Sequence, residues 1–260
     1  MITAGIDIGA RAAKAVILDE NAAPVHVIRP INDTIVRLSR DILTSALKQA
    51  RIRKRNLARI GITGYGRERV KFAQDRFTAP LCLARAAADL DRSVRSVIDL
   101  GGLITRVVQV NKNGGVADYI ENEKCASGSG RFLEMIAEAL ELPLERIGPE
   151  SLTSTRPLRL SSQCVVFAES EVISHVNADE PAADILAGVH RAIADRVRSL
   201  AGKIDYQPPV MIVGGVAKNT GVMHFLHLSL AAEIRKPPVD PQIMGALGAA
   251  LLARDRLVGG

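Results

Sequence analysis

The chain has 260 residues, of which 47% are hydrophobic and 24% are charged, and its formal net charge is +6. This composition is that of a folded globular protein and excludes an intrinsically disordered chain. With no Trp, 3 Tyr and 5 Phe, the sequence has too few aromatic rings for a platform that stacks nucleic-acid bases, so we expect no nucleic-acid partner.

The sequence also argues against a membrane protein. No stretch approaches 18 consecutive apolar residues, and the first ten residues lack the basic region and the long apolar region of a signal peptide. The three cysteines, Cys82, Cys125 and Cys164, cannot all pair within one chain, and free thiols suit a reducing compartment. We therefore expect a cytoplasmic protein whose thiols serve in packing, catalysis or metal binding.

In chain order, the first half reads as an antiparallel meander followed by a helix, a strand and a second helix. Short apolar runs bounded by glycine and polar residues predict the strands, and apolar residues at helical spacing predict the helices. The expected strands cover residues 2–8, 15–18, 25–28 and 59–63, and the expected helices cover residues 34–50 and 80–92.

The second half repeats this pattern. Strands are expected at residues 96–100, 105–110, 116–120 and 210–213, with a helix after each of Cys125 and Cys164 and a last helix at 243–253. Such a duplication predicts an α/β fold of two similar domains around a cleft. We place the domains at residues 1–94 and 95–240, and we expect residues 241–255 to pack back on the first domain.

Both halves open on a strand that carries an aspartate before a glycine turn. Gly9 follows Asp7, and Gly101 and Gly102 follow Asp99; a third turn, Gly214-Gly215, follows the strand at 210–213. Glycine turns let backbone amides approach phosphate oxygens, and the aspartates are suited to hold hydrated Mg²⁺. The sequence therefore predicts a nucleotide site between two facing turns, with neither a Walker A loop nor a Rossmann fingerprint.

Cys125 and Cys164 each precede an expected helix, where the helix dipole favours a thiolate. A [4Fe–4S] cluster takes four thiolates, so a dimer with two cysteines from each chain would complete one. Zinc is the alternative metal, although no CxxC pair or paired histidines support it. Cys82 lies in an apolar helical run, and we interpret it as a core residue.

Together these segments resemble one family, the ATPases that comprise 2-hydroxyacyl-CoA dehydratase activators and the ATP-binding subunits of ATP-dependent benzoyl-CoA reductase. The likeness runs from the first strand to the last helix. It rests on the motifs GIDIG with Lys14, ITGYGR, IDLGG, EKCASGSGRFLE, CVVFAESEVIS and VGGVAKNTGV.

The resemblance implies a duplicated actin/hexokinase/Hsp70-like ATPase fold. It further implies that two subunits share one [4Fe–4S] cluster, that ATP and Mg²⁺ bind in the cleft, and that ferredoxin supplies electrons for a catalytic CoA-ester reductase or dehydratase. By position, Cys125 and Cys164 would ligate the cluster. The residues that would bind nucleotide are Asp7, Gly9, Lys14, Asp99, Gly101, Gly102, Gly128, Gly130, Gly214, Gly215 and Asn219.

Two departures from the family pattern concern ATP hydrolysis. The family's second loop continues GGQDxK, whereas Leu103 and Ile104 stand here in place of Gln and Asp. The first loop has Ala10, Ala12 and Ala13 where hydroxyl residues are usual. Since an apolar pair cannot orient water, these departures favour the D-type ATPase-like subunit of benzoyl-CoA reductase, paired with a more intact paralogue.

Three alternatives stay open at this stage. The first is a homodimeric activator of a 2-hydroxyacyl-CoA dehydratase, in which both copies hydrolyse ATP. The second is a small-molecule kinase on the same fold, for which the second loop offers no carboxylate as a catalytic base. The third is a regulatory subunit that binds nucleotide and contributes cysteines without turnover.

Overall fold

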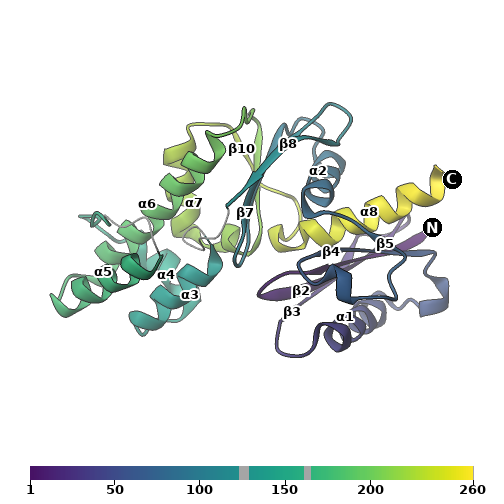
Figure 1. The fold of residues 1–260 in the computed structure, drawn as a ribbon, viewed down its shortest axis with the longest axis horizontal. Helices are drawn as coiled ribbons and strands as arrows, with labels where there is room; N and C mark the ends of the chain where they lie inside the picture. The colour runs from purple at the N-terminus through teal and green to yellow at the C-terminus, as the bar shows by residue number, and fades with distance from the viewer. Residues whose placement is uncertain (123–128, 161–164, 260) are drawn as a thin grey trace.

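The computed structural model describes residues 1–122, 129–160 and 165–259, and in this part of the chain two five-stranded mixed sheets form the two halves of the molecule (Figure 1). The first sheet contains β1 (Ile2–Ile8), β2 (Ala12–Asp19), β3 (Val25–Pro30), β4 (Arg59–Gly64) and β5 (Asp75–Arg76). The second contains β6 (Ser96–Leu100), β7 (Thr105–Val110), β8 (Val116–Glu121), β9 (Val210–Val213) and β10 (Ile234–Arg235).

The two sheets have the same strand order and the same strand directions. The orders are β3-β2-β1-β4-β5 and β8-β7-β6-β9-β10. In each sheet the first three strands pair as an antiparallel meander, and the last two add in parallel beside the first strand. This correspondence confirms the predicted duplication and the actin/hexokinase-like fold class.

Two helices lie between the sheets. The core there joins apolar side chains of β2 and β6 with those of α2 (Ala79–Leu90) and α8 (Met244–Val258). Helix α1 (Ile35–Ala50) packs against β1, β2 and β3. The sheets are therefore linked by a shared apolar layer, and the domain boundary near residue 94 stays a prediction.

Helix α8 lies very close to the first sheet and to α2. A Cβ atom added at Gly5 would lie 1.9 Å from the carbonyl oxygen of Ala246, and one added at Gly61 would lie 2.3 Å from that of Ala249. These contacts require glycine in β1 and β4, because any side chain would push the C-terminal helix away from the sheet.

The remaining α-helices share one apolar core with the second sheet. They are α3 (Gly130–Ala139), α4 (Leu144–Ser151), α5 (Val165–Asn177), α6 (Ala182–Ala201) and α7 (Thr220–Leu230), and the short 3-10 helices are η1 (Lys54–Asn56), η2 (Arg67–Arg69), η3 (Gly215–Lys218) and η4 (Pro241–Ile243). Of the helices described, none is both long enough and apolar enough to cross a bilayer.

The expected strands and helices are present with shifts of a few residues at their ends, but α4, α6 and α7 were not predicted. Residues 184–190 of α6 are consecutively buried, so this helix has no polar face in its middle to give a helical stripe. Helix α4 contains Gly148 and Pro149, which in a sequence indicate a break rather than a helix.

His190 on α6 is a titratable side chain that lies in the core. Its side chain is fully buried, and neither ring nitrogen has a hydrogen-bond partner among the described residues. Burial lowers the pKa of His190 to about 4 from its ordinary value of 6.5. Between these values the unfolded chain binds a proton that the folded chain does not, so stability falls as pH decreases.

We expect the free energy of unfolding to fall by about 2 kcal/mol between pH 7.5 and pH 5 because of His190. Urea denaturation at both pH values tests this, with His190→Gln as the comparison because the amide does not titrate. The variant should lose about 2 kcal/mol less than the wild-type chain over this range. An equal loss in both proteins would contradict the assignment.

Candidate functional site

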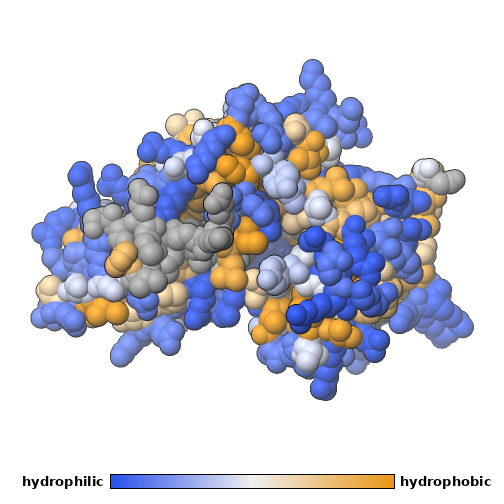
Figure 2. Space-filling view, in the orientation of Figure 1, coloured by the Kyte–Doolittle hydropathy of each residue, from blue (hydrophilic) through white to orange (hydrophobic). Residues whose placement is uncertain are grey.

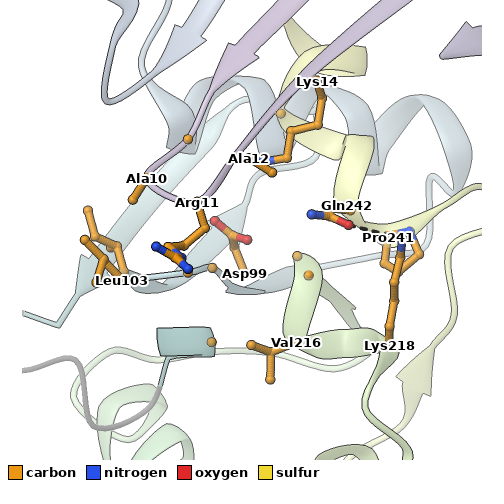
Figure 3. A pocket seen from close by; sticks show the side chains of 18 of the residues that line it. Ala10, Arg11, Ala12, Lys14, Asp99, Leu103, Val216, Lys218, Pro241 and Gln242 are labelled. Carbon is orange, nitrogen blue, oxygen red and sulfur yellow. Dashed lines mark hydrogen bonds between the residues drawn. The ribbon is translucent and has the colours of Figure 1, made fainter. Parts of the chain in front are cut away.

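A cavity of about 850 Å³ lies in the cleft between the two halves (Figure 3). The space-filling view shows the molecular surface hollowed between the two lobes (Figure 2). Residues of all three glycine turns line the cavity. Of the predicted nucleotide residues, it is lined by Asp7, Gly9, Lys14, Asp99, Gly101, Gly102, Gly130, Gly214, Gly215 and Asn219.

In the first turn an aspartate is paired with a lysine across adjacent strands. Asp7 of β1 is directly opposite Lys14 of β2, and the Lys14 Nζ atom donates to Asp7 Oδ2 at 3.1 Å. The Gly9 N–H closes the turn by donating to the Ala12 carbonyl at 3.1 Å. Both charged side chains are largely shielded from solvent, which strengthens their interaction.

The second turn repeats this arrangement in the other sheet. Asp99 of β6 is opposite Arg106 of β7, and Arg106 Nη1 donates to Asp99 Oδ2 at 3.2 Å. The Gly101 N–H donates to the Ile104 carbonyl at 3.0 Å. Two carboxylate-cation pairs, each next to a glycine turn, therefore line the same cavity from opposite lobes.

A further glycine, at the end of the neighbouring parallel strand, lies close to each aspartate. Gly64 ends β4 with φ +90°, and Gly214 follows β9 with φ +91°. Residues other than glycine rarely adopt such positive φ values. A Cβ atom would lie 2.4 Å from Asp7 Oδ1 at Gly64 and 2.6 Å from Asp99 Oδ1 at Gly214. These two glycines let the parallel neighbour strand pass directly beside the carboxylate.

The carboxylate of Asp99 is affected by burial and by the charges around it. Burial raises the pKa of Asp99; the positive charge of Arg106 lowers it, and the negative charge of Asp7 raises it. A divalent cation between phosphates and these carboxylates would offset this destabilisation of the charged form. No cluster of three or more metal-binding side chains occurs in the described ranges.

The third turn continues into α7. The Asn219 side chain accepts from the Val222 N–H at 2.9 Å and so caps the N-terminus of this helix. Lys218 Nζ donates to Asp240 Oδ2 at 2.7 Å and to Gln242 Oε1 at 3.1 Å, and the second of these bonds is drawn in Figure 3. This network joins η3 to η4 on one wall of the cavity.

The structure shows which of the residues that depart from the family pattern face the cavity. Ala10, Ala12 and Leu103 line the cavity, and none of them offers a polar group (Figure 3). Ile104 also lines it. Ala13, in contrast, is fully buried in the core beneath the first sheet, so a hydroxyl there would not have faced the ligand.

Arg11 is a cavity residue that the sequence patterns did not indicate. Its side chain points into the cleft and lies next to Asp99 in this view (Figure 3). Arg11 Nη2 lies 2.7 Å from Glu134 Oε2, and Arg11 Nε donates to Glu134 Oε1 at 3.1 Å. Glu134 belongs to α3 in the other lobe, so this ion pair bridges the cleft.

Cys125, Cys164 and Gly128 lie outside the described residues. The helices that follow the two cysteine motifs, α3 and α5, pack against each other. Helix α3 is bonded to the second turn, because the Gly130 and Arg131 N–H groups donate to the Gly101 and Gly102 carbonyls, both at 2.9 Å.

Cys82 agrees with its interpretation as a core residue. It belongs to α2 and is fully buried against α8, and burial raises the pKa of its thiol to about 12. A thiol of this kind is not available as a thiolate ligand at neutral pH.

Comparison with known proteins gives relatives that match nearly end to end. The 2-hydroxyisocaproyl-CoA dehydratase activator of Clostridioides difficile is 36% identical over 98% of this chain and 96% of its own. The (R)-2-hydroxyglutaryl-CoA dehydratase activating ATPase of Acidaminococcus fermentans is 37% identical over 96% of both chains. The D-type benzoyl-CoA reductase subunit of Thauera aromatica is 32% identical over 96% of this chain and 92% of its own.

Solved structures agree with this. The C. difficile activator with bound ADPNP superposes with a TM-score of 0.92 and 36% identity, covering 100% of this chain and 96% of the other. A hexokinase from Thermus thermophilus, at 17% identity and a TM-score of 0.55 over 100% of both chains, shares the fold alone. The identities favour the dehydratase-activator alternative over the D-type reductase subunit that the second loop had suggested.

A family model matches residues 4–253, which span both sheets and all three glycine turns. The match confirms the resemblance that the motifs predicted. The chain belongs to the BadF/BadG/BcrA/BcrD ATPase family.

Proposed function

We propose that this chain is an ATP-dependent activator of a 2-hydroxyacyl-CoA dehydratase. It binds ATP or ADP with Mg²⁺ in the cleft and works as a dimer with a second copy of itself. Reduced ferredoxin is the proposed electron donor, the dehydratase is the acceptor, and the cytoplasm is the proposed location.

The observation that carries the proposal is the repeated aspartate, glycine turn and cation that line one cavity from both lobes. Asp7 with Lys14 and Asp99 with Arg106 supply matching charges, and residues of the glycine turns line the same space. This arrangement suits a polyphosphate bound with Mg²⁺ between the lobes. The third turn, with Gly214, Gly215 and Asn219, is then the proposed adenosine site.

The proposed cluster ligands are Cys125 and Cys164 from each of two chains. Soft thiolate ligands suit an iron–sulfur cluster, and four of them complete a [4Fe–4S] cluster. When bound, the cluster would supply low-potential one-electron transfer. The hydrogen bonds from Gly130 and Arg131 to the second turn support a mechanical link between the nucleotide cleft and the helix that follows Cys125.

Exposed apolar side chains support a partner surface on α5. Phe167 is 68% exposed and Ile173 is 44% exposed. In the space-filling view, apolar surface interrupts the hydrophilic surface over α3 and α5 (Figure 2). Contact between two copies around α5 would remove these side chains from water.

Leu103 and Ile104 affect the proposed catalytic cycle. Arg106 and Lys14 can hold phosphates, but the wall at Leu103 and Ile104 has no side chain that orients an attacking water. We therefore expect hydrolysis to be slower than in a chain with Gln and Asp at these positions. The same feature keeps the D-type reductase subunit as a second candidate.

A reconstitution assay separates the two candidates. The anaerobically purified chain is mixed with reductant, MgATP and either a 2-hydroxyacyl-CoA dehydratase or the catalytic subunits of a benzoyl-CoA reductase together with its paralogous ATPase subunit. We expect MgATP-dependent activation of the dehydratase without any paralogue. Activation of the reductase alone would establish the second candidate, and activation of neither would reject both.

A further inference from the structure

We propose that Arg11 is a phosphate-binding residue that pairs with Glu134 when no nucleotide is bound. Nucleotide phosphates and Glu134 then compete for the same guanidinium. The inference rests on nucleotide binding in the cleft, as proposed above. It assigns to Arg11 the phosphate contact that Ala10 and Ala12 do not provide.

Arg11 lies where bound phosphates would be. Arg11 lies in the turn between β1 and β2, and it lines the cavity together with Gly9, Gly101 and Gly102. Figure 3 shows its side chain among cavity residues of both lobes, next to Leu103 and Asp99. A guanidinium at this place is within the region where the two glycine turns would hold phosphates.

Gly102 makes this position accessible. A Cβ atom at Gly102 would lie 2.4 Å from Arg11 Cγ and 3.0 Å from Arg11 Cβ, so only glycine allows the arginine stem to cross the second turn. The backbone of Arg11 is fixed, because its carbonyl accepts from the Ile31 N–H at 3.0 Å. The side chain can therefore move while the turn stays in place.

The charges favour exchange of partners. Arg11 and Glu134 form two contacts, at 2.7 and 3.1 Å, but the Arg11 side chain is 50% exposed, so the pair is weakly held. Glu134 has a second cation, because Arg131 Nη1 lies 3.2 Å from Glu134 Oε2. When Arg11 turns to a phosphate, Glu134 keeps Arg131 and no carboxylate is left unpaired.

Arginine forms planar, two-pronged hydrogen bonds with phosphate as well as with carboxylate. A triphosphate brings more negative charge to the cavity than the single charge of Glu134, and MgATP should therefore capture Arg11. Its capture releases Glu134, and with it α3, from the first lobe. Nucleotide binding would in this way loosen one connection between the lobes beside the helix that follows Cys125.

The test compares the affinities of four proteins for MgATP, MgADP and AMP by titration calorimetry. We expect Arg11→Gln to weaken MgATP binding about tenfold and AMP binding much less, because AMP lacks the outer phosphates. We expect Glu134→Gln to strengthen MgATP binding about threefold, since the competing carboxylate is gone. The opposite signs distinguish competition from a purely structural ion pair.

Arg131→Gln is the matched comparison, because it removes the other cation that contacts Glu134, at a residue that does not line the cavity. Without Arg131, Glu134 should hold Arg11 more firmly, so MgATP affinity should fall, but by less than about threefold and by less than in Arg11→Gln. Unchanged MgATP affinity in Arg11→Gln, or weaker MgATP affinity in Glu134→Gln, would overturn the inference. The proposed function would stand in either case, provided that the wild-type chain binds MgATP. A wild-type chain that binds none of the three nucleotides would overturn the proposed function itself.

Discussion

Gly214→Ala is expected to abolish nucleotide binding and to reduce the free energy of unfolding by about 3 kcal/mol. Gly214 has φ +91° and ψ 174°, a conformation that is essentially restricted to glycine. A methyl group would also lie 2.4 Å from the Leu100 carbonyl oxygen and 2.6 Å from Asp99 Oδ1. The substitution therefore displaces the second turn and its aspartate together.

Gly202→Ala is the matched control. Gly202 ends α6 with φ −67°, and its added methyl group would meet only ordinary contacts at 3.4 and 3.8 Å. This variant should differ from the wild-type chain by less than about 0.5 kcal/mol. Urea denaturation and MgADP titration check both variants, and equal MgADP affinity in the two would contradict the role given to the second turn.

Replacement of Cys125 or Cys164 by alanine is expected to remove nearly all bound iron from the anaerobically purified chain. Each subunit contributes two of the four proposed ligands, so a dimer of either variant keeps only two thiolates. Iron content and the visible absorption of the purified proteins measure the effect. Variants that keep the wild-type iron content would contradict the proposed ligand set.

Cys82→Ala provides the control for these variants. Cys82 is fully buried against α8 and its thiol has a pKa of about 12, so it should contribute no ligand. This variant should retain the iron content of the wild-type chain. Loss of iron from it as well would indicate that the substitutions act through folding rather than ligation.

The duplicated fold could be predicted because its signals are local. Asp7 and Asp99 are the last but one residues of β1 and β6, Gly9 and Gly101 follow these strands directly, and the strand patterns around them repeat in the same order. Since equivalent strands lead to equivalent turns, the meeting of the turns at one cavity followed from the topology. The strand pleat could also have separated Ala12 from Ala13, because neighbouring side chains point to opposite faces.

Contacts between distant residues could not be predicted in the same way. The Arg11–Glu134 pair joins residues 123 positions apart, and no sequence period indicates it. Helix α6 was missed because it is buried on all sides in its middle. The contact of Gly64 with Asp7 depends on a positive φ in a neighbouring strand, which the glycine alone did not indicate.

The second loop and the whole chain point to different partner enzymes. Leu103 and Ile104 form part of the cavity wall, so their change bears on how water is oriented there. Over nearly the whole chain the dehydratase activators are the more similar relatives, at 36% and 37% identity against 32% for the reductase subunit.

The central proposal is a nucleotide-binding subunit that shares a cluster with a second copy of itself. Its most direct test is to measure the iron content, the acid-labile sulfide content and the native mass of the anaerobically purified chain. We predict a homodimer with about four irons and four sulfides per two chains. An iron-free protein under strict exclusion of oxygen would contradict it.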